Sequence, residues 1–351
     1  MTLRNLSPQT MFERLAFEHK PLCRFGAKRS DFEAWKKTTC PKVLATLGDF
    51  PARVPLNPEL QVEWQENGLG KQRWIIDVGR HISAIFQINI PEGLKPHNKY
   101  PAILCWHGHT LFGKEAVMGD ESSPEKREFV KRHNYNYGHQ MAKAGFVTYA
   151  IDWFGRGDRN DDAKPNWRCQ NGGNRDWCNL YYLHATMLGM TPLAMNIIHG
   201  MAATDFACSF PFVDKNRLGV MGLSGGGTMT TWTALCDGRM KAAEIICYSD
   251  LFSLFGVRDA NYCGMQVAPG LFKLVDLPDL QGLLAPKPLL IDIGIYDVCF
   301  CVNGAMACFR RLKKIYAAAK AEKQLEQDLF PGEHAWGGNK SADFFHRHIG
   351  V

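Results

Sequence analysis

A serine flanked by glycines is the residue in this sequence best placed to do chemistry. The segment Leu218–Thr228 contains Gly222-Leu-Ser224-Gly-Gly226, directly after an apolar strand-like run and directly before a helical pattern. A sharp strand-to-helix turn of this kind lifts a serine hydroxyl to the carboxyl end of a sheet, and glycines avoid clashes within the turn. The same residues could form a glycine-rich turn in which Ser224 only caps a helix. The elements on both sides favour a nucleophilic serine and therefore predict acyl transfer.

A serine hydroxyl needs a neighbouring base to attack a carbonyl, and His334 is the best candidate. It lies in a Pro/Gly turn after the strand-like run Leu325–Phe330, and such a loop can bring an imidazole over the edge of a sheet. His346 and His348 lie instead in a closing helical pattern, so we expect them to be surface or core residues.

The third member of such a triad is a carboxylate that precedes the histidine in the chain. Asp250, Asp292 and Asp297 each lie in or just after a strand-like run. Asp292 is in the middle of its run, where its side chain would point into a sheet face. Asp250 is a competitor at the end of the preceding strand. We predict Asp297, because it follows the end of its strand on a loop that begins at Gly294.

Two backbone N–H groups are expected to stabilise the oxyanion that forms during acyl transfer. One belongs to Gly225, which follows the nucleophile, and the other to His109, in the loop after an early strand. His107 and His109 could alternatively ligate zinc together. Only one residue separates them and no third ligand is evident nearby, so we predict no metal site and no cofactor.

These residues need a framework, and the strand-like runs supply one. Residues 1–60 are predicted to be a helical extension packed on the core, with a break or kink at Pro41. Alternating or β-branched runs follow: Gln61–Gln65, Arg73–Val78 and Ile82–Ile90. After Pro101 the runs are continuously apolar: Ala102–Trp106, Val147–Ile151, Leu218–Leu223, Ala243–Tyr248 and Leu289–Ile295.

Helical stretches alternate with these apolar runs, including one predicted to start at Thr191-Pro192 and to end near Cys208. Strands buried on both faces and separated by helices imply an α/β fold with a mostly parallel central sheet and helices on both faces. We therefore predict a catalytic domain over residues 61–351.

The stretch 155–189 is polar and rich in Asn, Asp and Trp. It is too long for an ordinary strand-to-helix loop, so we expect it to form a cap or a wall of the substrate pocket. Trp153, Trp167 and Trp177 are the candidates for contact with the substrate.

At this point the sequence resembles the α/β-hydrolase superfamily, and most closely the dienelactone-hydrolase and acetyl-xylan-esterase-like branch of carboxylesterases. The resemblance covers roughly residues 60–350 and rests on His107-Gly-His109, Gly113-Lys-Glu115, Asp152-Trp-Phe-Gly-Arg-Gly157, Gly222-Leu-Ser-Gly-Gly-Gly227, Gly294-Ile-Tyr-Asp297 and Gly332-Glu-His334. Dienelactone hydrolases proper use cysteine as the nucleophile, so serine here points to esters. The resemblance implies a carboxylic ester hydrolase, with short acyl or acetyl esters as substrates. The segment after Gly294 departs from the pattern, because it reads Tyr-Asp-Val where Glu-Asp-Pro is more usual.

Two other functions fit the same fold. A prolyl-oligopeptidase-like peptidase has a similar catalytic domain, but such enzymes usually carry a β-propeller that residues 1–60 cannot make. A non-catalytic binding protein would keep the fold without the chemistry, and the three filled triad positions argue against it.

Composition limits the partners. The net charge is +6, but the basic residues are scattered, so we predict no nucleic-acid surface. No run approaches the roughly 18 apolar residues of a membrane-spanning helix, and no secretory signal is evident. Twelve cysteines without such a signal predict reduced thiols and a cytoplasmic location. The expected partner is a small-molecule ester, and homo-oligomerisation is an open alternative.

Overall fold

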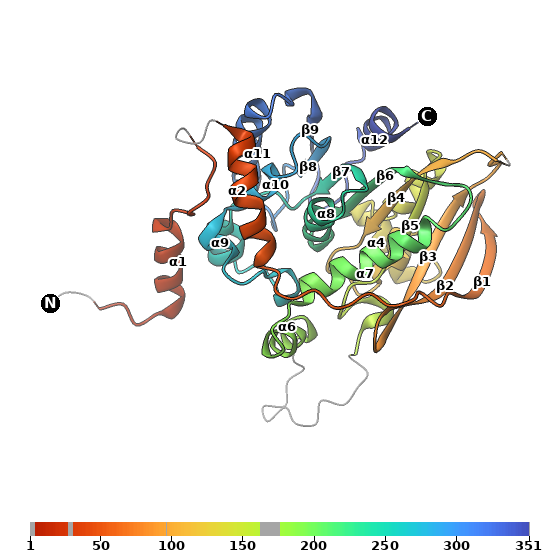
Figure 1. Ribbon diagram of the computed structural model, residues 1–351, viewed down its shortest axis with the longest axis horizontal. Coiled ribbons are helices and arrows are strands. Elements are labelled where there is room, and N and C mark those ends of the chain that lie inside the picture. Colours follow the sequence, from red (N-terminus) through yellow and green to blue (C-terminus); the bar gives the residue numbers. More distant parts are fainter. Residues whose placement is uncertain (1–3, 27–30, 96, 162–175, 351) are drawn as a thin grey trace.

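A nine-stranded sheet forms the centre of the computed structural model, which describes residues 4–26, 31–95, 97–161 and 176–350. The strands lie in the order β1-β2-β3-β5-β4-β6-β7-β8-β9 (Figure 1). Their bounds are β1 Glu59–Glu66, β2 Leu69–Gly79, β3 Ile82–Pro91, β4 Tyr100–Trp106, β5 Val147–Ile151, β6 Val213–Leu223, β7 Met240–Ile246, β8 Leu289–Gly294 and β9 Leu325–Phe330.

The sheet is antiparallel at one end and parallel over the rest. β1, β2, β3 and β5 pair in antiparallel fashion, whereas β5, β4, β6, β7, β8 and β9 all run in the same direction. The predicted mostly parallel α/β fold is therefore confirmed. In a parallel sheet the carboxyl ends of the strands lie at one edge, which is where sites form in open α/β folds.

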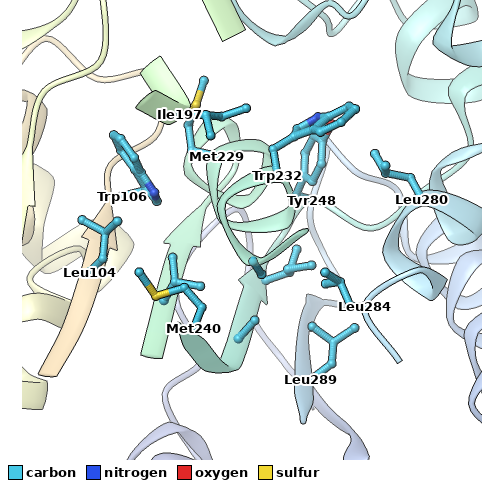
Figure 2. Close-up of a cluster of buried hydrophobic side chains, with 14 of the residues drawn as sticks. Leu104, Trp106, Ile197, Met229, Trp232, Met240, Tyr248, Leu280, Leu284 and Leu289 are labelled. Carbon is cyan, nitrogen blue, oxygen red and sulfur yellow. The ribbon is translucent and has the colours of Figure 1, made fainter. Parts of the chain in front are cut away.

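Alternate residues of the central strands belong to two different layers of the core. Leu104 and Trp106 of β4 pack on one face of the sheet, whereas Ile103 and Cys105 pack on the other. Figure 2 shows the first face, where Trp232 and Met229 of helix α8 cover the sheet. Burying one such large apolar side chain stabilises the fold by about 1.5–3 kcal/mol.

Helices supply both layers. The first face is covered by α2 (Phe32–Ala45), α7 (Pro192–Ala207), α8 (Gly225–Cys236), α10 (Leu277–Gly282) and α11 (Val302–Ala318). The second face is covered by α3 (Gly113–Val117), α4 (Pro124–His133), α5 (Tyr137–Lys143) and α12 (Ser341–Ile349). The other elements are α1 (Pro8–Glu18), α6 (Trp177–Met187), α9 (Leu271–Leu274), the 3-10 helices η1 (Gly157–Arg159), η3 (Gly264–Gln266) and η4 (Glu322–Gln324), and the π-helix η2 (Phe252–Arg258).

Helix α7 begins as the sequence predicts. The hydroxyl of Thr191 accepts a hydrogen bond from the Ala194 N–H at 3.1 Å, and Pro192 occupies the first turn. A proline there costs no hydrogen bond, because the first N–H groups of a helix have no intrahelical partner.

The N-terminal helices differ in how they pack. The Trp35 side chain of α2 is buried, and its indole N–H donates to the carbonyl of Cys23 at 2.7 Å. The break expected at Pro41 is wrong, since α2 continues through it to Ala45. Helix α1 lies at the edge of the molecule (Figure 1) and leaves Phe12 and Phe17 55% and 60% exposed.

No helix within the described ranges combines the length and the apolar character needed to cross a bilayer.

Candidate active site

The predicted nucleophile sits in a strained turn between β6 and α8. Ser224 has φ 61° and ψ −118°, a backbone conformation that side-chain-bearing residues rarely adopt. Such a conformation costs on the order of 1–3 kcal/mol and persists only where the surroundings impose it. Here the Ser224 N–H donates to the carbonyl of Ile246 at 2.9 Å, and its own carbonyl accepts from Gly227 at 2.7 Å.

Glycines let α8 approach the sheet closely enough to hold that turn. A Cβ on Gly226 would lie 2.3 Å from the carbonyl oxygen of Trp106, and one on Gly222 would lie 2.6 Å from the carbonyl oxygen of Gly226. Any side chain at either position would push the helix away from β4. The Gly-x-Ser-x-Gly spacing is therefore a packing requirement of this turn.

The loops after β9 and β8 bring His334 and Asp297 together. Nδ1 of His334 lies 2.8 Å from Oδ2 of Asp297, and the Asp297 side chain is almost fully buried. The other carboxylate oxygen of Asp297 accepts from the N–H groups of Cys299 and Phe300 at 2.7 and 3.0 Å. The ring of Phe300 stacks on the imidazole of His334 with 5.8 Å between centroids. A proton on Nδ1 that is donated to Asp297 leaves the Nε2 lone pair of His334 to act as a base.

The competing carboxylates have other neighbours. Asp292 is fully buried within β8, and burial, together with the negative charges of Glu244 and Asp328, holds its pKa well above the usual range. Asp250 accepts from the N–H of Leu251 at 2.7 Å, and burial raises its pKa to about 7.

The competing histidines both lie on α12. Nε2 of His346 lies 3.0 Å from the carbonyl oxygen of Ala144, and His348 lies beside Glu326 at 3.7 Å. Their contacts are those of surface and packing residues, as the sequence predicts.

Ser224 and His334 line the same cavity, which has a volume of about 520 Å³. Its wall combines polar and aromatic side chains from the loops at the carboxyl edge of the sheet. The lining residues are His109, Phe129, His133, Tyr135, Asp176, Asn179, Leu223, Ser224, Ala260, Asn261, Tyr262, Cys263, Gln266, Cys299 and His334. This volume is within the range of small-molecule sites.

The two predicted oxyanion donors lie next to each other. Gly225 is the first residue of α8, where backbone N–H groups have no intrahelical partner. A Cβ on Gly225 would lie 3.2 Å from Nδ1 of His109, so the two residues are in contact range. A hydrogen bond fixes the loop that carries His109, because the Gly108 N–H donates to the hydroxyl of Tyr135 at 2.6 Å.

Of the three tryptophans predicted to contact substrate, the two that the structure describes do not line this cavity. The prediction for Trp153 is wrong, because its side chain is 0% exposed and packs edge-on behind His109, with 4.8 Å between centroids. Trp177 is half-buried and packs on Tyr181 of α6, at the side of a second cavity of about 420 Å³. Trp167 lies outside the described residues.

His107 and His109 face different partners. His107 is buried and accepts from the indole N–H of Trp153 at 2.7 Å, and burial lowers its pKa to about 4. Its imidazole is therefore neutral at physiological pH. Nε2 of His109 lies 3.0 Å from the sulfur of Cys263. The two histidines do not share a ligand position.

A buried ion pair links the loops after β4 and β5. Nζ of Lys114 lies 2.9 Å from Oδ2 of Asp152, and the Lys114 N–H donates to Oδ1 at 2.7 Å. The Lys114 and Asp152 side chains are 0% and 1% exposed. These residues belong to two of the motifs on which the family resemblance rests, and their contacts join α3, which follows the His109 loop, to the residue after β5.

Several cavity residues have no signal in the sequence. Tyr135, Asn179, Asn261 and Gln266 come from segments far apart in the chain, and none belongs to a recognisable motif. Asn179 accepts from the N–H of Gly264 at 2.9 Å and so joins α6 to η3. In the described part of the 155–189 stretch, Asp176 and Asn179 line the cavity.

A parallel sheet with a serine on the turn after β6, and with loops after β8 and β9 converging on it, defines the α/β-hydrolase fold. A family model described as "Abhydrolase family" matches residues 2–311, and the chain belongs to that family. The resemblance to α/β-hydrolases seen in the sequence is thus confirmed.

Known proteins agree with this assignment. The chain is 26% identical over 278 residues to "Putative hydrolase YtaP" of Bacillus subtilis (strain 168), covering 78% of this chain and 86% of that protein. A solved structure named "putative acetyl xylan esterase" from Bacteroides fragilis NCTC 9343 is similar over 93% of this chain and 83% of its own, with TM-score 0.72 and 19% identity. A glucuronoyl esterase from Teredinibacter turnerae T7901 is similar over 95% and 90%, with TM-score 0.64 and 15% identity. At these identities the solved structures show a shared fold.

Proposed function

We propose that this protein is a serine hydrolase that cleaves carboxylic esters through an acyl-enzyme intermediate. The observation that supports this most directly is that His334, which lines the same cavity as Ser224, lies 2.8 Å from the buried carboxylate of Asp297. A histidine oriented by a carboxylate, in the same cavity as a serine on a strained turn, is the set of groups that serine acyl transfer requires.

In the proposed first step the Ser224 hydroxyl attacks the ester carbonyl while Nε2 of His334 takes its proton. The negative charge that forms on the carbonyl oxygen is stabilised by the N–H groups of Gly225 and His109. His334 then gives the proton to the departing alcohol, which leaves an acyl group on Ser224. In the second step His334 takes a proton from water and the hydroxide attacks the acyl-enzyme. His334 then returns that proton to the departing Ser224 oxygen, and the carboxylic acid is released. Asp297 holds the imidazole in the required tautomer throughout.

We propose short acyl esters, acetyl esters in particular, as substrates. The names of the similar structures, acetyl xylan esterase and glucuronoyl esterase, support ester hydrolysis. A cavity of about 520 Å³ with polar side chains from α6 and from the segment 260–266 would suit a small acyl group on a polar alcohol.

The test is hydrolysis of p-nitrophenyl acetate by the wild type and by Ser224→Ala. Loss of nearly all activity is expected in Ser224→Ala, and Ser209→Ala, an exposed serine at the end of α7, is the matched control. A fluorophosphonate probe should label the wild type on the peptide that contains Ser224. Equal rates for wild type and Ser224→Ala would refute the serine mechanism, and no adduct on an inactive wild type would favour the non-catalytic binding protein.

The base is tested in the same assay. His334→Ala should lose activity, whereas His346→Ala should retain it, because His346 lies on α12 and contacts the carbonyl of Ala144 at the end of α5. A peptidase of the prolyl-oligopeptidase kind is the other enzymatic candidate. The described residues form one sheet with helices and contain no propeller blades, which favours the ester hydrolase.

A cytoplasmic location stays a prediction, as does a small-molecule ester partner. Homo-oligomerisation is also a prediction. Phe12 and Phe17 of α1 support it, because they form an exposed apolar surface.

A further inference from the structure

Three side chains from three distant segments meet at one wall of the substrate cavity. They are His109 from the loop after β4, Cys178 from the first turn of α6, and Cys263 from the segment before η3. Nε2 of His109 lies 3.0 Å from Sγ of Cys263 and 3.8 Å from Sγ of Cys178. All three potential ligand atoms lie within 4.8 Å of one another, and both thiols are free.

This spacing is close to what one tetrahedral ion needs. With metal–sulfur distances of about 2.3 Å and metal–nitrogen distances of about 2.0–2.1 Å, neighbouring ligand atoms in a zinc site lie about 3.5–3.8 Å apart. The two distances from His109 are 3.0 and 3.8 Å and no pair of ligand atoms is more than 4.8 Å apart, so shifts of up to about 1 Å would close the three ligands around an ion.

The chemistry of the donors is equally specific. Two cysteine sulfurs and one imidazole nitrogen are soft or borderline ligands, which select Zn²⁺ rather than Mg²⁺ or Ca²⁺. Cys178 lies in the first turn of α6, and the hydrogen bond to Cys263, together with burial, raises the pKa of its thiol above the usual range. A hydrogen bond from the Cys178 thiol holds the pKa of Cys263 below its usual range, so this sulfur is the readier of the two to become a thiolate.

We propose that His109, Cys178 and Cys263 form a binding site for Zn²⁺ in the wall of the substrate cavity, which departs from the expectation of no metal drawn from the sequence. Binding replaces the two thiol protons, which are released to solvent, and His109 contributes the lone pair of Nε2. The two thiolates balance the charge of the ion. Asp176 is already engaged, since its oxygens accept from the Cys178 N–H and the Asn179 amide at 3.0 Å each. The fourth ligand is therefore water or a substrate oxygen from the cavity.

An ion at this site would cross-link three segments of the fold. It would join the loop that carries a predicted oxyanion donor to α6 and to the segment before η3. The hydrogen bond between Asn179 and Gly264 already joins the latter two. A bound ion would fix α6 over the cavity and should raise the melting temperature of the protein, because the three ligands come together only in the folded state.

The test distinguishes this site from two alternatives. Cys178 and Cys263 could form a disulfide instead, which would leave His109 without a role. An ion could also choose the second cluster of potential ligands, Cys247, Asp297 and His334, which includes the proposed catalytic pair.

The experiment titrates the full-length, untagged protein, reduced with a phosphine, with Co²⁺ and then Zn²⁺. We expect one Co²⁺ per chain, with a thiolate-to-cobalt charge-transfer band and the intense visible bands of tetrahedral Co²⁺, and displacement of both by Zn²⁺. Cys178→Ser and Cys263→Ser should each weaken binding by more than about 100-fold, since the loss of a partner outside the ligand shell already costs 10–100-fold. Circular dichroism checks that each variant is folded.

Cys299→Ser is the matched control, because Cys299 lines the same cavity outside the cluster. It should bind Co²⁺ like the wild type, and so should His334→Ala. Binding that survives Cys178→Ser and Cys263→Ser overturns the proposal, as does binding that His334→Ala abolishes. Absence of Co²⁺ binding to the reduced protein also overturns the proposal, and a cross-linked peptide pair that contains Cys178 and Cys263 in the unreduced protein would establish the disulfide in its place. All of these readouts are independent of esterase activity.

Discussion

Oδ2 of Asp297 lies 2.8 Å from Nδ1 of His334, although the two residues are 37 positions apart in the chain. β8 and β9 are adjacent and parallel, so the loops after them leave the same edge of the sheet. These loops are bonded to each other, since the Tyr296 N–H donates to the carbonyl of Gly332 at 3.0 Å. Gly294 makes the approach possible, because a Cβ there would lie 2.3 Å from the carbonyl oxygen of Glu333.

Replacing Asp297 by Asn should lower kcat for p-nitrophenyl acetate by about 10³–10⁴-fold, because the amide favours the wrong tautomer of His334 and cannot stabilise the imidazolium. KM should change little. Asp250→Asn is the control and should stay near the wild-type rate, since its carboxyl bonds to the N–H of Leu251. A near-normal Asp297→Asn beside a crippled Asp250→Asn would reverse the assignment.

Tyr135→Phe should lower kcat without unfolding the protein. The Tyr135 hydroxyl accepts from the Gly108 N–H at 2.6 Å, and its removal leaves that buried N–H unpaired at a cost of about 1–3 kcal/mol. The loop can relieve this cost only by moving, which displaces the N–H of His109 from the reacting carbonyl. We expect a fall in kcat of about 10–100-fold, by analogy with losing part of an oxyanion donor. Tyr149→Phe, whose hydroxyl bonds to Thr204 in the core, is the control, and an equal fall there would show a general packing effect.

Asp152→Ala should destabilise the protein by about 3–5 kcal/mol, because it removes the buried carboxylate that pairs with the buried ammonium of Lys114. Urea unfolding gives the free energy. Asp158→Ala is the comparison, since Asp158 also pairs with Lys114 but is 30% exposed. Asp158→Ala should lower the free energy of unfolding clearly less than Asp152→Ala does. Equal losses for the two variants would mean that the Asp152 pair is not the anchor of these loops.

Glu244→Gln should make the protein less sensitive to rising pH. Glu244 lies buried in β7, where Ser341 and Trp336 donate to one of its oxygens at 2.6 and 3.0 Å. Burial raises its pKa to about 7, above the value of about 4.3 in an unfolded chain. The contribution of protonated Glu244 to the free energy of unfolding is therefore fully present below about pH 4.3, and it is lost as the pH rises through about 7.

The measurement for Glu244 is the melting temperature of wild type and variant between pH 5 and pH 8. The wild type should lose stability relative to Glu244→Gln over this interval. Glu128→Gln, at an exposed glutamate, should follow the wild type at each pH. Parallel curves for wild type and Glu244→Gln would show that Glu244 does not titrate in this range.

Much of the framework is readable from the sequence because it depends on local patterns. Continuous apolar runs bounded by turns predict the parallel strands, and Thr191-Pro192 predicts the start of α7. The spacing of glycines around Ser224 predicts a tight turn, since only residues without a side chain fit between α8 and β4. In each case the residues that decide the structure are neighbours in the chain.

Only the tertiary structure decided which distant residues meet. Three aspartates lie in or just after strand-like runs, and the order of β7, β8 and β9 in the sheet, together with the length of each loop, brought Asp297 to His334. The same packing put Trp153 behind the cavity wall and set Cys178 and Cys263 beside His109. Local sequence specifies backbone conformation and which face of an element is apolar. Contacts between elements depend on how the whole sheet and its helices exclude water together, and no short stretch of residues encodes that.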